Sequence, residues 1–211
     1  MSAFCGMPPA KSARCSISSS PMSPLLTNDR VLAFVAPSGT GKTTLLSATV
    51  EVLARQGLRV AVLKATHHHI ALDTPGKDSW RHAEAGAKFV GIVGPGSATI
   101  FLDPRPATDA RRAQARELAE WLFACPAGAP DLVLCEGFFS QPGLPKLRVV
   151  RGAWPEDLWR GEDPADIVAI SWDADADARQ ERSAELQRPV LPLLPEELAR
   201  YLCHRAGLAQ K

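Results

Sequence analysis

The sequence lacks long apolar runs, paired cysteines and an excess of charge of either sign. No apolar segment approaches the roughly 20 residues that a transmembrane helix requires. The five cysteines are scattered and form no Cys-x-x-Cys pair, which argues against a disulfide framework and favours a reducing compartment. The formal net charge is +1, so electrostatics gives no reason to expect a nucleic acid or a membrane as partner. These absences together predict a soluble, cytoplasmic protein.

The N-terminal segment is poor in acidic residues and rich in Ser, Pro and Ala, with no acid before Asp29. A segment of this composition cannot bury a core. We therefore predict a disordered tail over residues 1–28 and a single domain over residues 29–211. A transit peptide, or a true start at Met7 or Met22, are alternative interpretations of the same segment.

Beyond the tail, strand-like apolar runs alternate with segments of helical spacing, which predicts βαβ units and a mainly parallel sheet. The polar stretch 173–188 predicts either a surface helix or a loop. The expected strands are 31–35, 58–63, 131–135, 167–170 and 190–191, with an edge strand over 146–150 and a hairpin of 89–93 with 98–102; the expected helices are 44–55, 77–87, 108–124 and 195–204.

The most informative motif is A-P-S-G-T-G-K-T-T-L over residues 36–45, which follows one expected strand and opens a helix. This is the context of a P-loop (Walker A). Glycines at positions 39 and 41 let the backbone turn its N–H groups toward a polyphosphate. Lys42 supplies a mobile charge for the β- and γ-phosphates, and Thr43 a hydroxyl for Mg²⁺. The predicted phosphate-binding residues are Ser38, Gly39, Thr40, Gly41, Lys42, Thr43 and Thr44.

A second acidic motif, D-L-V-L-C-E-G, places Glu136 and Gly137 at the end of an apolar strand. The carboxyl ends of the strands form the ligand crevice of a doubly wound sheet, so Glu136 should lie near the P-loop. There it can hold Mg²⁺ directly or through water, while Gly137 permits close approach to a phosphate. The alternative is a solvated residue just past the strand.

The segment 64–82 has the most unusual composition, with three adjacent histidines and several charged residues. It follows a strand, so we expect it at the same crevice, where such groups can orient water, hold Mg²⁺ or sense a γ-phosphate. Asp78 also suits the simpler role of a cap at a helix N-terminus. For the histidines, exposed loop positions, ligand contacts and a transition-metal site all stay open.

Together these motifs resemble the MobB family, molybdopterin-guanine dinucleotide biosynthesis protein B. The resemblance rests on G-T-G-K-T-T-L, on T-H-H-H followed by D-T-P-G-K-D-S-W-R-H, and on D-L-V-L-C-E-G-F. It implies a three-layer α/β P-loop NTPase with a mainly parallel sheet flanked by helices and a small β-hairpin extension.

The resemblance also implies a function. It indicates a GTP-binding protein with weak Mg²⁺-dependent GTPase activity, which acts mainly as an adaptor, works as a homodimer and assists a MobA-type guanylyltransferase in attaching GMP to molybdopterin. Thr43 and Glu136 would lie near Mg²⁺, and Asp73 and Asp78 would be the candidate catalytic carboxylates. The residues implied to line the nucleotide or partner-facing crevice are His67, His68, Asp73, Lys77, Asp78 and Arg81.

Two other functions compete with this interpretation: a small-molecule kinase that uses ATP, and a nickel-delivery GTPase suggested by the histidines. No N-K-x-D base-recognition motif is present. Asp173 or Asp175 can contact a guanine or belong to a surface turn. The choice of GTP therefore rests on the family resemblance.

Overall fold

A six-stranded parallel sheet forms the centre of the molecule, in the order β2-β5-β1-β6-β7-β8. The computed structural model describes residues 28–66, 70, 73–102, 115–125 and 128–209. A separate antiparallel hairpin pairs β3 with β4 through the turn at Pro95 and Gly96. The predicted α/β class, mainly parallel sheet and hairpin extension are confirmed. The strands are β1 (Val31–Val35), β2 (Val60–Lys64), β3 (Phe89–Gly94), β4 (Ser97–Leu102), β5 (Leu132–Glu136), β6 (Lys146–Val150), β7 (Ile167–Trp172) and β8 (Val190–Pro192).

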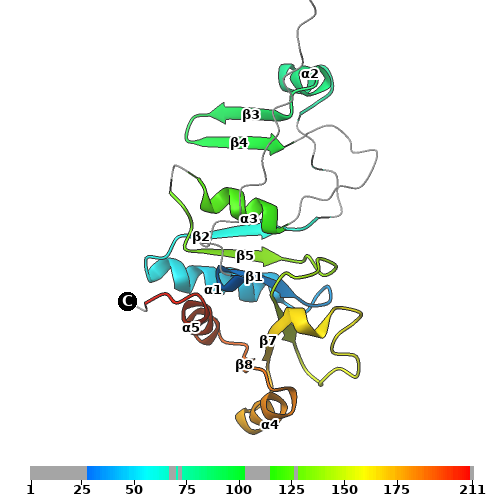
Figure 1. Ribbon diagram of the computed structural model, residues 1–211, viewed down its shortest axis with the longest axis vertical. Helices are drawn as coiled ribbons and strands as arrows, with labels where there is room; N and C mark the ends of the chain where they lie inside the picture. The colour runs from blue at the N-terminus through cyan, green and yellow to red at the C-terminus, as the bar shows by residue number, and fades with distance from the viewer. Residues whose placement is uncertain (1–27, 67–69, 71–72, 103–114, 126–127, 210–211) are drawn as a thin grey trace, which may run out of the picture.

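Helices cover both faces of the sheet, with α1 and α5 on one side and α3 on the other (Figure 1). α4 packs beside the edge strand β8, and α2 lies beyond the hairpin at one end of the molecule (Figure 1). The helices are α1 (Lys42–Arg55), α2 (Asp78–Glu84), α3 (Ala115–Phe123), α4 (Ala176–Leu186) and α5 (Pro195–Arg205), with 3₁₀ turns η1 (Asn28–Arg30) and η2 (Pro164–Asp166).

The central strand β1 is buried along its whole length. Its side chains alternate between faces, as the two-residue period of a strand requires. Leu32 and Phe34 pack in the core under α1 and α5, whereas Val31, Ala33 and Val35 pack in the core under α3. A parallel strand covered on both faces is expected to be apolar throughout, which explains the uninterrupted run in the sequence.

The prediction of an edge strand over 146–150 is wrong, because β6 lies between β1 and β7. Its two charged residues, Lys146 and Arg148, are no more than 2% exposed and form ion pairs inside the protein. The Lys146 Nζ atom lies 3.2 Å from an Asp166 carboxylate oxygen, and Arg148 forms an ion pair with Glu162. The alternation of charged and apolar residues therefore reflects buried ion pairs and not exposure to solvent.

Burial destabilises the charged forms of Glu162 and Arg148. It raises the pKa of Glu162 and lowers the pKa of Arg148, while their mutual attraction opposes both changes. Arg148 also donates a hydrogen bond of 3.2 Å to the Trp159 carbonyl and lies 5.7 Å from the centre of the Phe139 ring. A buried pair of this kind is costly to break, because the remaining partner would be an uncompensated buried charge.

The other predicted elements are confirmed with shifted ends. The stretch 173–188 is helical over α4, whose N-cap Asp175 accepts a hydrogen bond of 2.8 Å from the Ala178 N–H. Of the helix expected over 108–124, the structure describes α3, and residues 103–114 lie outside the described part. Residues 1–27 of the expected tail also lie outside it. Within the described residues, no helix is long and apolar enough to cross a membrane.

Three cysteines lie in the described part of the chain, and all three are free: Cys125, Cys135 and Cys203. Burial in the sheet raises the pKa of Cys135 to about 12, so this thiol stays protonated and acts as a small apolar side chain. The remaining two, Cys5 and Cys15, fall outside the described residues.

Replacing Glu162 with alanine should destabilise the fold strongly, because Arg148 and Lys146 would lose a buried counter-charge. We expect a loss of about 3–5 kcal/mol in the free energy of unfolding, measured by urea denaturation. The matched control is Glu185→Ala, which breaks the exposed i,i+3 pair with Arg182 and should cost less than about 1 kcal/mol. Equal effects of the two substitutions would contradict this account of β6.

Candidate functional site

The phosphate loop connects the end of β1 to the start of α1. Gly39 and Gly41 have φ angles of 79° and 81°, a region that side chains with a Cβ rarely adopt. Gly41 is the N-cap of α1 and supplies no side-chain hydrogen bond to the first turn. The N–H groups at this helix end are therefore free of a side-chain cap, as an anion site at a helix N-terminus requires. The Thr40 hydroxyl donates a hydrogen bond of 2.8 Å to the Pro37 carbonyl and closes the turn.

A cluster of charged and hydroxyl groups lies beside this loop. β1 and β5 are parallel neighbours with Phe34 opposite Glu136, so both strands end at the same place. The Thr43 hydroxyl donates a hydrogen bond to Glu136 Oε1, and Lys42 Nζ lies 3.9 Å from the same oxygen. Lys64, the last residue of β2, places its Nζ 3.6 Å from the other carboxylate oxygen. The structure thus brings Lys42, Thr43 and Glu136 together at the end of the sheet.

These groups fit a magnesium ion. Mg²⁺ prefers oxygen ligands and is commonly held by one or two protein groups together with phosphates and water. The adjacent Thr43 hydroxyl and Glu136 carboxylate provide such oxygens at the first turn of α1. In the part of the chain that the structure describes, no group of three or more His, Cys, Asp or Glu side chains is arranged to hold a metal ion. His67 and His68 lie outside the described residues.

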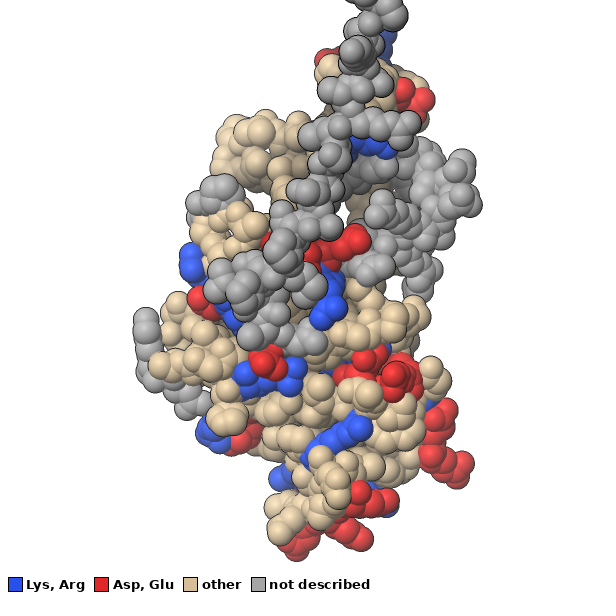
Figure 2. Space-filling model, in the orientation of Figure 1, with Lys and Arg blue, Asp and Glu red and all other residues tan. Residues whose placement is uncertain are grey.

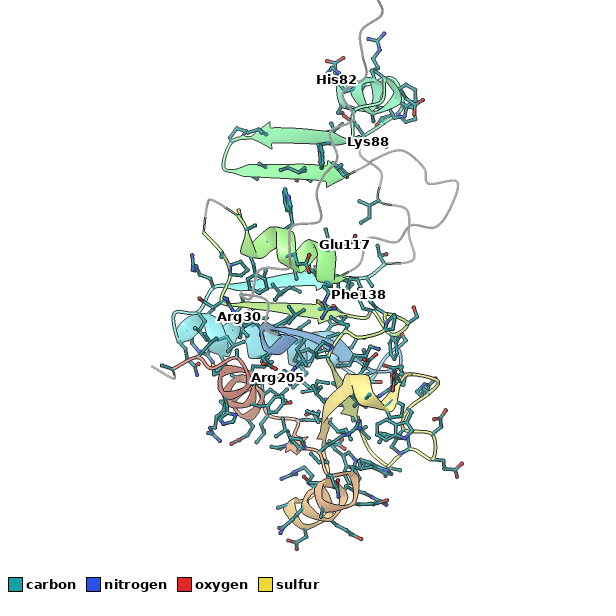
Figure 3. The ribbon with its side chains drawn as sticks, viewed as in Figure 1. Arg30, His82, Lys88, Glu117, Phe138 and Arg205 are labelled. Carbon is teal, nitrogen blue, oxygen red and sulfur yellow. The ribbon has the colours of Figure 1, made fainter. Side chains whose placement is uncertain are left out.

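The chain turns sharply directly after Glu136. Gly137 has a φ of 88°, and Phe138 follows with a φ of 62°, which is unusual for a residue with a side chain. A Cβ on Gly137 would lie 3.2 Å from the Cβ of Ala65, so the close neighbour of this glycine is the segment that leaves β2. Figure 3 shows Phe138 at the end of β5. The turn therefore packs the chain after Glu136 against the chain after Lys64.

The other predicted site residues lie elsewhere in the molecule. Lys77, Asp78 and Arg81 belong to the start of α2 and are exposed. α2 lies at one end of the molecule, beyond the hairpin and away from α1 (Figure 1), and Figure 3 shows His82 on α2 well separated from Phe138. The structure therefore does not bring these residues to the phosphate loop, because they belong to α2, which lies beyond the hairpin.

Asp73 has a local role before α2. Its carboxylate accepts hydrogen bonds from the Ser79 hydroxyl and, at 2.7 Å, from the Thr74 N–H. These two bonds, the Ser79 bond foremost, lower the pKa of Asp73. The carboxylate thus ties the loop to the first turn of α2, in the way that Asp residues fix turns and helix starts.

One residue of the site was missed by sequence reasoning. Arg151 directly follows β6, and its Nε–H donates a hydrogen bond of 3.0 Å to the Thr40 carbonyl of the phosphate loop. A basic residue directly after a strand could have indicated a position beside the phosphate loop. Because that strand was predicted at the edge of the sheet, Arg151 was not expected there. The two acids considered for guanine recognition have local backbone partners: Asp173 accepts from the Gly152 N–H and Asp175 caps α4.

Comparison with known proteins identifies the family of the chain. Residues 31–173 match the model of MobB, described as molybdopterin guanine dinucleotide synthesis protein B. The chain belongs to the MobB family. The matched region includes the phosphate loop, Glu136 and Arg151, so the site described above lies within the part shared with MobB.

Similar MobB relatives come from two bacteria, and both are named molybdopterin-guanine dinucleotide biosynthesis adapter protein. The Haemophilus influenzae protein is 32% identical over 148 residues, which are 70% of this chain and 78% of that protein. The Escherichia coli protein is 51% identical over 131 residues, or 61% of this chain and 71% of that protein. A crystal structure of molybdopterin-guanine biosynthesis protein B (mobB) is 26% identical and has a TM-score of 0.50, covering 84% of this chain and 99% of that one.

The contact between Gly137 and Ala65 can be tested by substitution. Gly137→Ala places a Cβ in a left-handed conformation, at a cost of about 1–2 kcal/mol, and also against Ala65. The control Gly143→Ala has a φ of 70° but open space around its Cβ, so it should show the conformational cost alone. We expect Gly137→Ala to be less stable than the control by about 1 kcal/mol or more in urea denaturation. Equal losses would show that the packing beside Glu136 is loose.

Proposed function

We propose that this protein is a GTP-binding adapter of molybdenum cofactor biosynthesis, which assists a MobA-type guanylyltransferase in attaching GMP to molybdopterin. The observation that carries this proposal is the cluster of Lys42, Thr43 and Glu136 beside a phosphate loop in a chain of the MobB family. The names of the relatives support the adapter role. The adapter would act in the cytoplasm, where the free cysteines of the described residues are stable.

Each group at the phosphate loop has a defined task in this proposal. The backbone N–H groups of residues 39–43 bind the phosphate oxygens, and Lys42 neutralises the charge of the β- and γ-phosphates. Thr43 and Glu136 would hold Mg²⁺, and the ion would supply positive charge to the same phosphates. Because Asp73 and Asp78 lie away from the loop, we propose that hydrolysis is slow and that binding is the main activity.

The exposed start of α2 suits a docking role. Lys77, Asp78 and Arg81 present charges of both signs to solvent at the end of the molecule opposite α4 (Figure 1). Mixed charges on a surface favour a specific orientation of a partner more than a high affinity. We propose that this end contacts the guanylyltransferase or its molybdopterin, while the phosphate loop holds the nucleotide.

The nucleotide proposal predicts that the protein binds Mg-GTP more tightly than Mg-ATP in isothermal titration calorimetry. Lys42→Ala should weaken GTP binding about 100-fold, or about 2.7 kcal/mol, because the β- and γ-phosphates lose their counter-charge. The control Lys88→Ala removes the same charge near α2 and should leave binding unchanged (Figure 3). Preferential ATP binding would instead favour the small-molecule kinase.

We also propose that the protein forms a homodimer through the hairpin. An isolated two-stranded hairpin is marginally stable in water, so β3 and β4 need a cover. Large exposed apolar patches mark protein interfaces, and β2, the edge strand on this side of the parallel sheet, pairs on one side only, with β5. In Figure 2 the hairpin surface is free of charged residues. The exposed apolar side chains of this region are Val62, Phe89, Ile92, Val93, Ile100 and Trp121.

The dimer can be tested at Val93, whose side chain is 83% exposed near the hairpin turn. Val93→Asp should convert a dimer to a monomer in sedimentation velocity, because a buried unpaired carboxylate is costly at an interface. The matched control is Leu194→Asp, which alters another exposed apolar residue, directly before α5, and should leave the dimer intact. A wild-type protein that sediments as a monomer at high concentration would reject the proposal.

A further inference from the structure

Arg151 lies at the same end of the sheet as the phosphate loop. β6 runs parallel to β1, with Val35 opposite Arg148, so β6 continues only as far as Val150 beyond the end of β1. Arg151 directly follows the last residue of β6, just as the loop follows Val35. Glu136 approaches the loop from the neighbouring strand on the other side of β1. The loop is therefore flanked by an acidic side chain from β5 and a basic side chain from β6.

The guanidinium group of Arg151 contacts the backbone of the loop. Its Nε–H donates a hydrogen bond of 3.0 Å to the Thr40 carbonyl. A Cβ placed on Gly41 would lie 3.4 Å from Arg151 Nη2, so the guanidinium lies against this glycine. The contact is with a carbonyl, whereas phosphate binding uses the N–H groups of the loop. Arg151 thus engages the loop without using the groups that face a phosphate.

The backbone next to Arg151 is fixed by the end of β7. The Gly152 N–H donates a hydrogen bond of 2.7 Å to the Asp173 carboxylate, and the Gly152 carbonyl accepts one of 2.7 Å from the Trp172 indole. The Trp172 ring in turn packs edge-on against Trp154, with 4.7 Å between the ring centres. Two bonds on one residue hold the base of the Arg151 side chain, so the hydrogen bond to Thr40 connects the loop to a rigid support.

We propose that Arg151 is a positioning residue of the phosphate loop, which holds Gly39 to Gly41 in the binding conformation through the Thr40 carbonyl. This inference rests on the proposed nucleotide binding for its effect on affinity. A loop that is ordered before binding loses less conformational freedom when the ligand arrives. The glycines that let the loop form also make it flexible, so an external anchor has a clear physical purpose.

The main alternative is that Arg151 acts only by its positive charge near the phosphates. Glutamine separates the two roles. The Nε2 atom of glutamine and the Nε atom of arginine are both bonded to Cδ, so Arg151→Gln keeps an N–H donor at the same distance along the side chain and removes the charge. Arg151→Lys keeps the positive charge but has the carbon Cε, which cannot donate a hydrogen bond, where arginine has Nε.

The experiment compares Arg151→Ala, Arg151→Gln and Arg151→Lys. We expect Arg151→Ala and Arg151→Lys to bind Mg-GTP about tenfold more weakly than wild type, as the loss of one hydrogen bond to a charged group implies. Arg151→Gln should stay within about threefold of wild type. The control Arg55→Ala removes an arginine from the exposed pair with Glu51 on α1 and should bind normally. Restoration by lysine and not by glutamine would overturn the proposal in favour of a charge contact.

Hydrogen exchange of the nucleotide-free protein tests the same role without any ligand. Amides of residues 38–44 should exchange several-fold faster in Arg151→Ala than in wild type or in Arg151→Gln, while peptides of α5 stay unchanged. If wild type binds no nucleotide but this exchange pattern is seen, the proposed function is rejected and the positioning role of Arg151 is supported. If wild type binds GTP and Arg151→Ala neither weakens binding nor loosens the loop, the anchor fails alone.

Discussion

The parallel pairing of β1 with β5 on one side and β6 on the other is the constraint on which the site depends. Parallel strands end at the same edge of a sheet, so this pairing delivers Glu136, the phosphate loop and Arg151 to one place. Parallel strands at the centre of a sheet must be covered on both faces. The helices α1 and α5 on one face and α3 on the other therefore determine whether the site can form at all.

The same constraint explains the buried charges of β6. A central strand has no exposed side on which Lys146 and Arg148 can meet water, so Glu162 and Asp166 must compensate them inside the protein. Glu162 lies in the segment between β6 and β7, and Asp166 ends η2 directly before β7. These ion pairs thus link the segment between β6 and β7 to β6 itself, the strand that Arg151 directly follows. Replacing both partners of such a pair by apolar residues is often neutral for the free energy of unfolding. We therefore relate these pairs to the position of the segment after β6 and not to a net gain in stability.

Local patterns were sufficient to predict the elements and the phosphate loop. The glycine spacing, Lys42 and Thr43 are contiguous, and the strand before Glu136 is apolar throughout, so short-range reasoning found both. The order of the strands was not available from the same patterns. A strand that reads K-L-R-V-V looks half exposed until the acids that neutralise it, 14–20 residues later, are known to lie beside it. Arg151 was missed for the same reason, since its value depends on which strand is next to β1.

The placement of Asp73 and α2 shows a different limit. Sequence reasoning treated everything after β2 as part of the crevice, and Lys64 does lie there, in contact with Glu136. Asp73 and Ser79 instead bond to each other and stabilise the start of α2, which packs against β3 of the hairpin. The described part of the chain therefore comprises a parallel sheet that carries the phosphate loop and an extension, α2 with the hairpin, on which apolar side chains such as Phe89 and Val93 are exposed. The proposed adapter function would use this division, with the phosphate loop holding the nucleotide and the extension meeting a partner.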